Sequence, residues 1–131
     1  MRNPRRSALW ILLVVCCLLE PAVAQEEHPF DPFRAEKNVE IGEFYMRKKN
    51  YDAAIERFKE SIRYKPNFAL PHRLLGEAYE KKGEKGEALE FYKKYLQVQP
   101  SASDAGKIRK RIERLSRDLE WETTRRKRAL D

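Results

Sequence analysis

The chain has 131 residues, of which 37% are charged, and a formal net charge of +7. This length allows one small domain, and the high fraction of charged residues excludes a thick hydrophobic core. Both cysteines lie near the N-terminus, at positions 16 and 17, so the rest of the chain has no disulfide and no thiol chemistry.

Residues 1–24 have the form of a secretory signal peptide. Three arginines precede an uninterrupted apolar run from Ala8 to Leu19, and Ala22 and Ala24 fit the small-residue motif for cleavage before Gln25. We therefore expect an exported protein that is periplasmic or secreted.

Two other interpretations of this segment stay open. An uncleaved segment would anchor the protein in a membrane, although the run is shorter than the roughly 20 apolar residues that a spanning helix needs. The other is lipidation of Cys16 or Cys17, although Val15 precedes the first cysteine where lipoprotein signals have a small residue.

Residues 25–34 form a short polar lead-in that ends in a helix start. The Asp31 carboxylate can cap free amides, and Pro32 suits the first helical position. We expect Asn67 to cap the third helix. The hydrophobic periodicity predicts helices over residues 32–48, 51–64, 69–82 and 85–98.

Residues 35–68 and 69–102 are copies of each other at an offset of 34 residues. Some positions hold identical residues in both copies, and others hold residues of similar size, such as Phe58 and Tyr92. The identical pairs are Ala35 and Ala69, Gly42 and Gly76, Glu43 and Glu77, Tyr45 and Tyr79, Lys48 and Lys82, Ala54 and Ala88, Glu56 and Glu90, Lys59 and Lys93, and Pro66 and Pro100.

The recurring small residues indicate close helix packing. A glycine inside a helix, such as Gly42, costs about 1 kcal/mol relative to alanine, so we expect another backbone to come close to it. Ala54 supplies a small surface on the second helix, and Phe58 fills the space beside it.

The second copy repeats this arrangement with Gly76, Ala88 and Tyr92. Pro66 and Pro100 end the second helix of each copy, because proline cannot continue a helix.

This spacing resembles the tetratricopeptide repeat, whose signature places Leu-Gly, Tyr, Ala, Phe and Pro at these intervals. The resemblance covers residues 35–102 and implies an all-α solenoid of two helical hairpins. Asn38 and His72 occupy the position that is usually large in the family, so we expect looser packing where each repeat begins.

The repeat signature is lost after Pro100, but helical periodicity continues in residues 103–131. One narrow apolar stripe flanked by charge predicts a capping helix that begins at Ser103 or Asp104. Self-pairing as a short coiled coil is an alternative use of the stripe. The stripe consists of Ile108, Ile112, Leu115 and Leu119.

Positive charge is concentrated at the C-terminus. Residues 103–131 contain ten Lys and Arg against six Asp and Glu, and the run from Arg125 to Arg128 is the densest. This run is either a solvated helix end or a contact for anionic lipid or an acidic protein. We do not expect nucleic acid to be a partner of an exported protein. Trp121 lies just past the stripe, either packed or exposed.

The resemblance implies that the first helix of each repeat lines a concave groove that holds an extended or helical peptide. Val39, Met46 and Leu70 would grip apolar side chains, while Glu43 and Glu77 form an acidic strip beside a basic cap. The full set comprises Glu36, Val39, Glu43, Met46 and Arg47, then Leu70, Arg73, Glu77, Glu80 and Lys81, and finally Lys107 and Arg111.

One subclass of the family binds chaperone C-termini with a lysine and an asparagine on the first groove helix. Val39 and Glu43 stand at those positions here. Because a terminal carboxylate would be repelled by Glu43, we do not expect this specificity.

No catalytic constellation is present in the sequence. The only histidines are His28, in the lead-in, and His72, which we expect to be a packing or surface residue. No glycine-rich phosphate loop or metal-ligand spacing occurs, so we expect no enzyme activity, no cofactor and no metal.

We therefore expect a non-catalytic, exported adaptor that binds a protein or peptide in the cell envelope. A membrane-surface protein that docks on anionic lipid through its basic C-terminal helix is the alternative. Self-association is compatible with either, because a stack of two repeats leaves apolar end surfaces.

Overall fold

The computed structural model describes residues 29–130, so the predicted signal peptide lies outside the described residues. In this part of the chain there are five α-helices and no strand, as predicted for an all-α fold. The helices are α2 (Pro32–Arg47), α3 (Tyr51–Tyr64), α4 (Ala69–Lys82), α5 (Lys85–Val98) and α6 (Ala105–Arg128).

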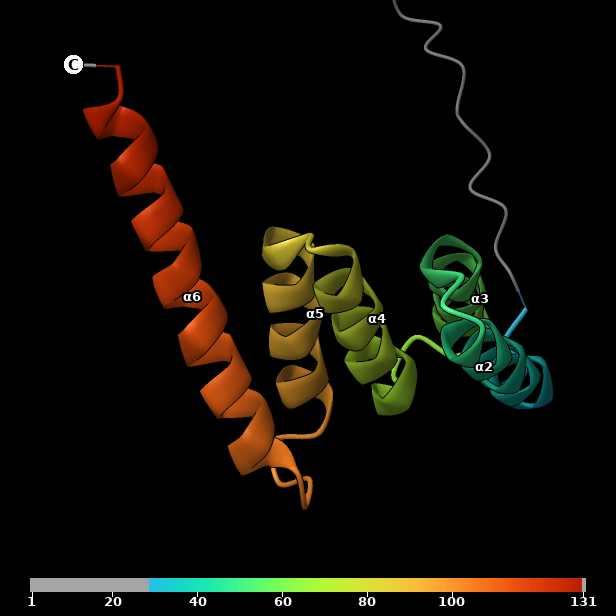
Figure 1. The fold of residues 1–131 in the computed structure, drawn as a ribbon. Helices are drawn as coiled ribbons and strands as arrows, with labels where there is room; N and C mark the ends of the chain where they lie inside the picture. The colour runs from blue at the N-terminus through green and yellow to red at the C-terminus, as the bar shows by residue number, and fades with distance from the viewer. Residues whose placement is uncertain (1–28, 131) are drawn as a thin grey trace, which may run out of the picture.

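The helices pack in chain order as a row (Figure 1). The hairpin of α2 and α3 packs through α3 against α4, and the hairpin of α4 and α5 packs through α5 against α6. This is the stacking of an α-helical solenoid, in which each unit contacts only its neighbours. None of the described helices is both long and apolar enough to cross a bilayer.

The helix starts follow the sequence with one exception. Asp31 caps α2 by accepting a 2.9 Å hydrogen bond from the Arg34 amide, with Pro32 in the first turn. The predicted cap of α4 by Asn67 is wrong. The chain turns at this point, since the Phe68 amide bonds the carbonyl of Lys65, and α4 begins only after Phe68.

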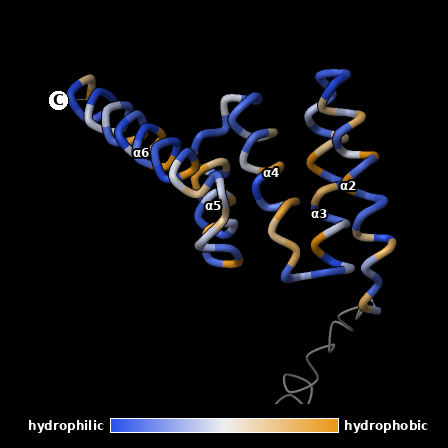
Figure 2. The backbone as a smooth tube through the Cα atoms, turned by 90° about the horizontal axis from the view of Figure 1, so that it is seen from below, coloured by the Kyte–Doolittle hydropathy of each residue, from blue (hydrophilic) through white to orange (hydrophobic). Residues whose placement is uncertain are grey.

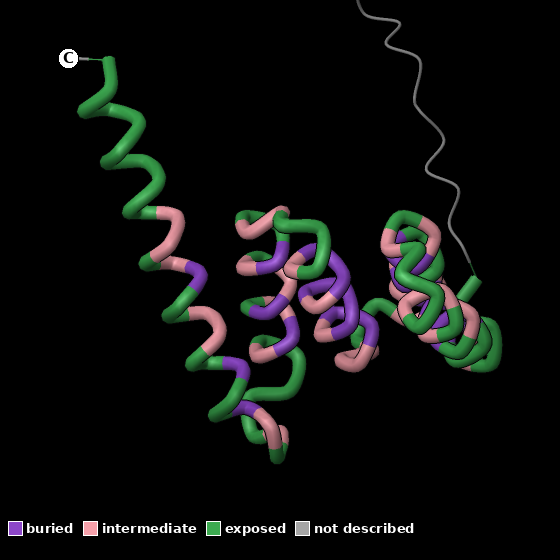
Figure 3. The backbone as a smooth tube through the Cα atoms, in the orientation of Figure 1, coloured by how far each residue is buried: buried purple, intermediate pink, exposed green. Residues whose placement is uncertain are grey.

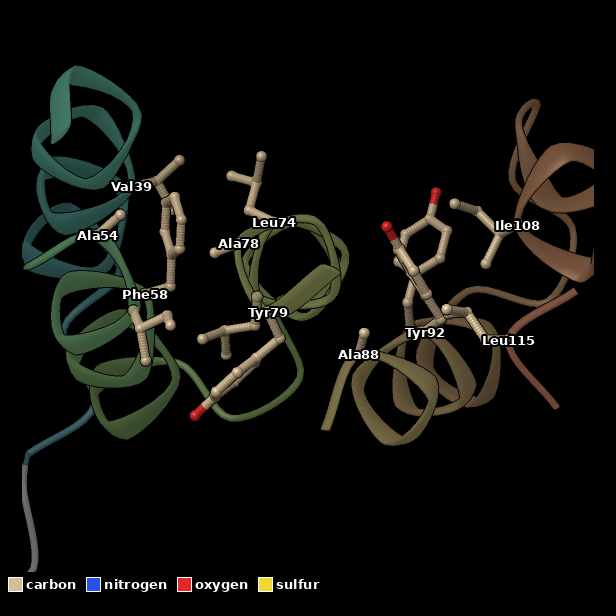
Figure 4. Close-up of a cluster of buried hydrophobic side chains, with 13 residues drawn as sticks. Val39, Ala54, Phe58, Leu74, Ala78, Tyr79, Ala88, Tyr92, Ile108 and Leu115 are labelled. Carbon is tan, nitrogen blue, oxygen red and sulfur yellow. The ribbon is translucent and has the colours of Figure 1, made fainter. Parts of the chain in front are cut away.

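The core is one continuous cluster that runs through all five helices (Figure 4). It extends from Val39 in α2, through Phe58 in α3, Leu75 in α4 and Tyr92 in α5, to Leu115 in α6. Hydrophobic residues lie mainly along the faces between helices, whereas most of α6 is hydrophilic (Figure 2). The core is thin because each helix contributes buried side chains from only one or two narrow faces.

Gly42 and Gly76 lie against aromatic rings of the second helix in their hairpins. The ring of Phe58 occupies the space that a β-carbon on Gly42 would need. The Tyr92 ring does the same at Gly76, with its Cδ1 2.6 Å from that position. The close approach is therefore made by a ring, whereas the sequence suggested a backbone.

The two alanines that were predicted to give each hairpin a small surface are completely buried. Ala54 in α3 and Ala88 in α5 have no exposed area, and both belong to the core cluster (Figure 4). They therefore serve packing alone and offer no surface to a partner. The helices that carry them end at Tyr64 and Val98, two residues before the predicted proline stops.

Tyr45 and Tyr79 occupy the same repeat position in α2 and α4, and both pack against the core to different extents. Tyr45 is partly buried against the core, whereas Tyr79 is only 8% exposed and belongs to it. The Tyr79 ring stacks on Phe91 of α5 with centroids 5.5 Å apart. The tyrosine position thus contributes to packing in both repeats, as the sequence predicted.

Asn38 and His72 close the packing at the start of each repeat, contrary to the looser packing that we expected. Both are more than nine-tenths buried. The Asn38 amide donates to the carbonyl of Arg34 at 2.9 Å, and the His72 ring stacks on Phe91 with centroids 6.3 Å apart. The Asn38 amide thus has a carbonyl partner, whereas His72 places Nε2 3.4 Å from the Pro66 carbonyl and leaves Nδ1 buried with no partner among the described residues.

The last helix caps the stack as predicted. It begins after Asp104 and buries Ile108 and Leu115 against α5. Lys110 and Glu113, at the repeat positions of Gly76 and Tyr79, are exposed. These charged side chains do not provide the small and aromatic surface that Gly76 and Tyr79 provide in the second repeat.

Candidate protein-binding groove

Three helices that occupy equivalent repeat positions, α2, α4 and α6, contribute to one hollow of about 310 Å³. Its lining mixes an apolar thioether with carboxylates and cations. The lining residues are Met46 from α2, Glu77, Glu80 and Lys81 from α4, and Arg111 from α6. All five belong to the set that the sequence predicted for the groove, and their binding role stays a prediction.

The other predicted groove residues do not line this hollow and differ in exposure, and Glu36 lines a separate hollow with Phe33, Lys37 and Glu40. Glu43 and Arg73 are half-buried, whereas Glu36, Arg47 and Lys107 are exposed. These side chains are accessible, although they do not line the hollow itself.

Two predicted apolar contacts are packed inward. Val39 is only 5% exposed and belongs to the core, so the expectation that it grips a ligand is wrong. It points into the cluster around Phe58 (Figure 4). Leu70 is partly buried against the same core. Met46 is therefore the apolar side chain that the hollow offers.

Glu80 is the centre of a polar network at the floor of the hollow. Its carboxylate accepts a hydrogen bond of 2.8 Å from the Tyr92 hydroxyl, on α5. It also pairs with Arg111 at 3.3 Å and with Arg114 at 2.5 Å, both on α6. One carboxylate thus joins three helices, and charge-assisted bonds of this kind are the stronger ones in proteins.

Arg114 is not among the groove residues predicted from the sequence. The repeat itself contained the signal, because Arg114 follows Glu80 by one repeat length, as Arg111 follows Glu77. Equivalent positions on successive helices of a solenoid are neighbours in space. Opposite charges at one such position therefore predict an ion pair between α4 and α6.

Tyr92 is protonated in this setting. Burial raises the pKa of the Tyr92 hydroxyl above its usual range, and the adjacent Glu80 carboxylate acts in the same direction. Arg111, which donates to the hydroxyl at 2.8 Å, opposes this rise. The neutral phenol therefore serves as a fixed donor between the two charges.

A second network ties the start of α6 to α4 and α5. Arg73 pairs with Glu77 at 2.6 Å and with Asp104 at 3.6 Å. The Tyr95 hydroxyl donates to Asp104 at 2.5 Å, and burial raises the pKa of Tyr95 to about 12. These contacts join the start of α6 to both helices of the second hairpin.

Among residues 29–130, no group of His, Cys, Asp and Glu side chains is arranged to hold a metal ion. His72 lies 3.4 Å from the Pro66 carbonyl, and burial lowers the pKa of its ring. This histidine packs within the repeat, and it lies outside the set that lines the hollow.

Comparison with protein families agrees with the repeat pattern. A model described as TPR repeat matches residues 42–83, and one described as tetratricopeptide repeat matches residues 74–101. Residues 42–101 therefore match models of the tetratricopeptide repeat. Repeats of this kind are protein-interaction modules whose stacked helices form a concave binding surface.

One similar solved structure, with a TM-score above 0.5, supports the fold. The solution structure of protein BPP2914 from Bordetella parapertussis is similar over 95% of this chain and 96% of its own, with 15% identity and a TM-score of 0.58. The first TPR of Spaghetti (RPAP3), bound to an HSP90 peptide, matches over 69% of this chain and 96% of its own, with 16% identity and a TM-score of 0.33. No curated protein matches the chain.

Proposed function

We propose that this protein is a non-catalytic adaptor of the cell envelope that holds a segment of another protein in the groove of its repeats. The hollow that three helices build together is the observation that carries this proposal. Its supports are the repeats, the signal-like residues 1–24 and the absence of a catalytic constellation from the sequence.

The charges of the hollow indicate which side chains a bound segment should offer. Glu80 is neutralised by the cations of α6, whereas Lys81 has no ion pair among the described residues. A suitable segment therefore offers an acidic side chain to Lys81 and an apolar one to Met46. Contacts of this kind give specificity and orientation, while the apolar anchor supplies most of the affinity.

Capture from cells with matched variants tests the groove. A tagged full-length protein with Met46→Asp and Lys81→Glu is compared with one that has Lys93→Glu and Gln97→Asp, two exposed changes on α5 that alter the net charge by the same amount. We expect one discrete envelope protein to be lost from the first variant and kept by the second. Equal capture by both variants would remove the groove from the proposal.

Export is tested separately. Cells that produce the full chain are fractionated, and the N-terminus of the purified protein is determined. We expect the protein in the periplasm or medium, with Gln25 as its first residue. An intact N-terminus in the cytoplasmic fraction would contradict an envelope function.

The end of α6 favours a second candidate, docking on anionic lipid. All residues from Glu120 to Leu130 are exposed (Figure 3), and Trp121 is 62% exposed. Trp121, Arg125 and Arg128 share one helical face, which combines an interfacial aromatic with cations. Lys85 holds the helix to α5 through Glu122 at 2.5 Å, so the basic end projects beyond that anchor.

Vesicle co-sedimentation decides this candidate. Vesicles with phosphatidylglycerol are compared with uncharged phosphatidylcholine vesicles at low and high salt. If α6 docks on lipid, Arg125→Glu, Arg126→Glu and Arg128→Glu together abolish binding, whereas Lys49→Glu, Arg57→Glu and Lys93→Glu do not. Equal losses from both triple variants would indicate only a general charge effect.

A further inference from the structure

The outer face of α2 bears an exposed stripe. Phe33, Lys37, Glu40 and Phe44 follow one another at intervals of three and four residues, which places them on one face of the helix. Phe33 is 78% exposed and Phe44 is 47% exposed. Between them Lys37 and Glu40 form an exposed pair at 2.9 Å. Two exposed phenylalanines on one short face are unusual for a surface that meets only water.

The second repeat shows what this face does in the solenoid. Pro71, Leu74 and Ala78 occupy the positions of Lys37, Glu40 and Phe44, and all three are buried. Ala78 points toward Phe58 of α3 in the preceding hairpin (Figure 4), and Leu74 belongs to the same core cluster. The outer face of α2 is therefore a stacking face, and no described segment packs on it.

The stripe is complementary to itself. In an antiparallel pair of α2 helices, with the twofold axis between Asn38 and Val39 along the chain, Phe33 of one copy faces Phe44 of the other. The same register places Lys37 opposite Glu40 of the second copy. A twofold interface requires this reciprocity, and the four residues satisfy it in both charge and apolar character.

The surface also has room for the opposing ring. Phe33, Glu36, Lys37 and Glu40 line a hollow of about 220 Å³ on this face. In the antiparallel register, Phe44 of the second copy lies beside Phe33 at this hollow. Aromatic rings that enter such recesses commonly dominate the energy of an interface.

We infer that two copies of this chain pair through the outer faces of their α2 helices. The second copy takes the place of the preceding repeat that the stack lacks among its described residues. One helix pair lies at the small end of specific interfaces, so the dimer is weak, with a dissociation constant in the range of about 1 to 100 μM.

Sedimentation equilibrium across this concentration range tests the pairing. The protein is purified from cells that express the full chain. We expect a monomer–dimer equilibrium that Phe33→Asp with Phe44→Asp weakens about 30-fold or more. Trp121→Asp with Leu130→Asp, an equally exposed apolar pair on or just past α6, leaves it unchanged. A monomer throughout the range, or equal weakening by both variants, would overturn the inference.

Charge exchange tests the register. Lys37→Glu alone sets two carboxylates against each other and weakens the dimer, while Lys37→Glu with Glu40→Lys restores complementarity and dimerisation. Because these side chains are exposed, neither change disturbs the monomer, as circular dichroism verifies. Failure of the double exchange to restore pairing would contradict the antiparallel register.

Disulfide trapping tests the same register by proximity. In a chain with Cys16→Ser and Cys17→Ser, Phe33→Cys and Phe44→Cys proteins are oxidised alone and mixed. We expect a covalent dimer only from the mixture, because like positions lie several turns apart in an antiparallel pair. A covalent dimer from either protein alone, or none from the mixture, would overturn the proposed arrangement.

Discussion

The Tyr92 hydroxyl donates a 2.8 Å hydrogen bond to Glu80, a bond that the first repeat cannot make. One repeat earlier, the equivalent positions are occupied by Phe58 and Met46. The first repeat thus has two apolar residues where the second has two polar ones. The second repeat uses the aromatic position both to fill the space at Gly76 and to fix the carboxylate that pairs with α6.

Removing this hydroxyl should destabilise the protein. Tyr92→Phe keeps the ring at Gly76 but leaves Glu80 and Arg111 without their shared partner. We expect the free energy of unfolding to fall by about 1–2 kcal/mol in urea denaturation. Tyr51→Phe, whose hydroxyl has no hydrogen bond among the described residues, should change it by less than about 0.5 kcal/mol. Equal effects would show that Tyr92 contributes only its ring.

Filling the glycine position should also destabilise the protein. Gly76→Ala gains about 1 kcal/mol of helix propensity but forces the Tyr92 ring to move. Overpacking of this kind costs roughly 1–3 kcal/mol, so we expect a net loss in thermal or chemical denaturation. Gly86→Ala, with no atom within 4 Å of the new carbon, serves as the control and should be neutral or stabilising. A stabilised Gly76→Ala protein would contradict the close packing.

Stability should depend on the ionisation of His72. Burial lowers the pKa of His72 below its usual 6.5, because the charged ring would lose its water, and Lys94 acts in the same direction. The unfolded chain therefore binds this proton more readily, and stability falls as the pH decreases from about 6.5 through the lower folded pKa. His72→Gln should remove this part of the dependence in denaturation curves at pH 7.5 to 4.5. An unchanged pH profile would show that His72 is not desolvated.

The Ser61 hydroxyl should be dispensable. Ser61 is completely buried in α3, and its hydroxyl has no hydrogen bond within the described part of the chain. Ser61→Ala removes this polar group without adding volume, so we expect a gain of about 0.5–1 kcal/mol in unfolding free energy. Ser61→Val, which adds volume in the same place, should lose stability by overpacking. A loss with alanine would indicate a hydrogen bond that bridging water supplies.

Periodicity and repetition determine most of this fold. The 34-residue repeat, with helix breaks after each stripe, predicted α3, α4 and α5 with their observed bounds and α2 to within one residue. The capping helix followed from its apolar stripe. These features depend on local patterns and on small residues such as Ala54 and Ala88, which the sequence displays directly.

The predictions that proved wrong concern side chains whose positions depend on tertiary packing, which local sequence patterns do not reveal. Val39 looked like a groove residue by its place in the repeat, but an apolar side chain beside a core is drawn into it. Asn67 is a good cap by type, yet the turn at Lys65 moves the helix start past it. The sequence predicted an acidic strip beside a basic cap, but the particular partners of Glu80 depend on which side chains meet between α4 and α6.

The most direct test of the central claim, that the concave face binds another protein, is photo-crosslinking in cells from position 81, in the hollow, and from position 93, exposed on α5. We predict one discrete adduct from position 81 that Met46→Asp abolishes, and no such adduct from position 93. The same adducts from both positions, or none from position 81, would contradict the account.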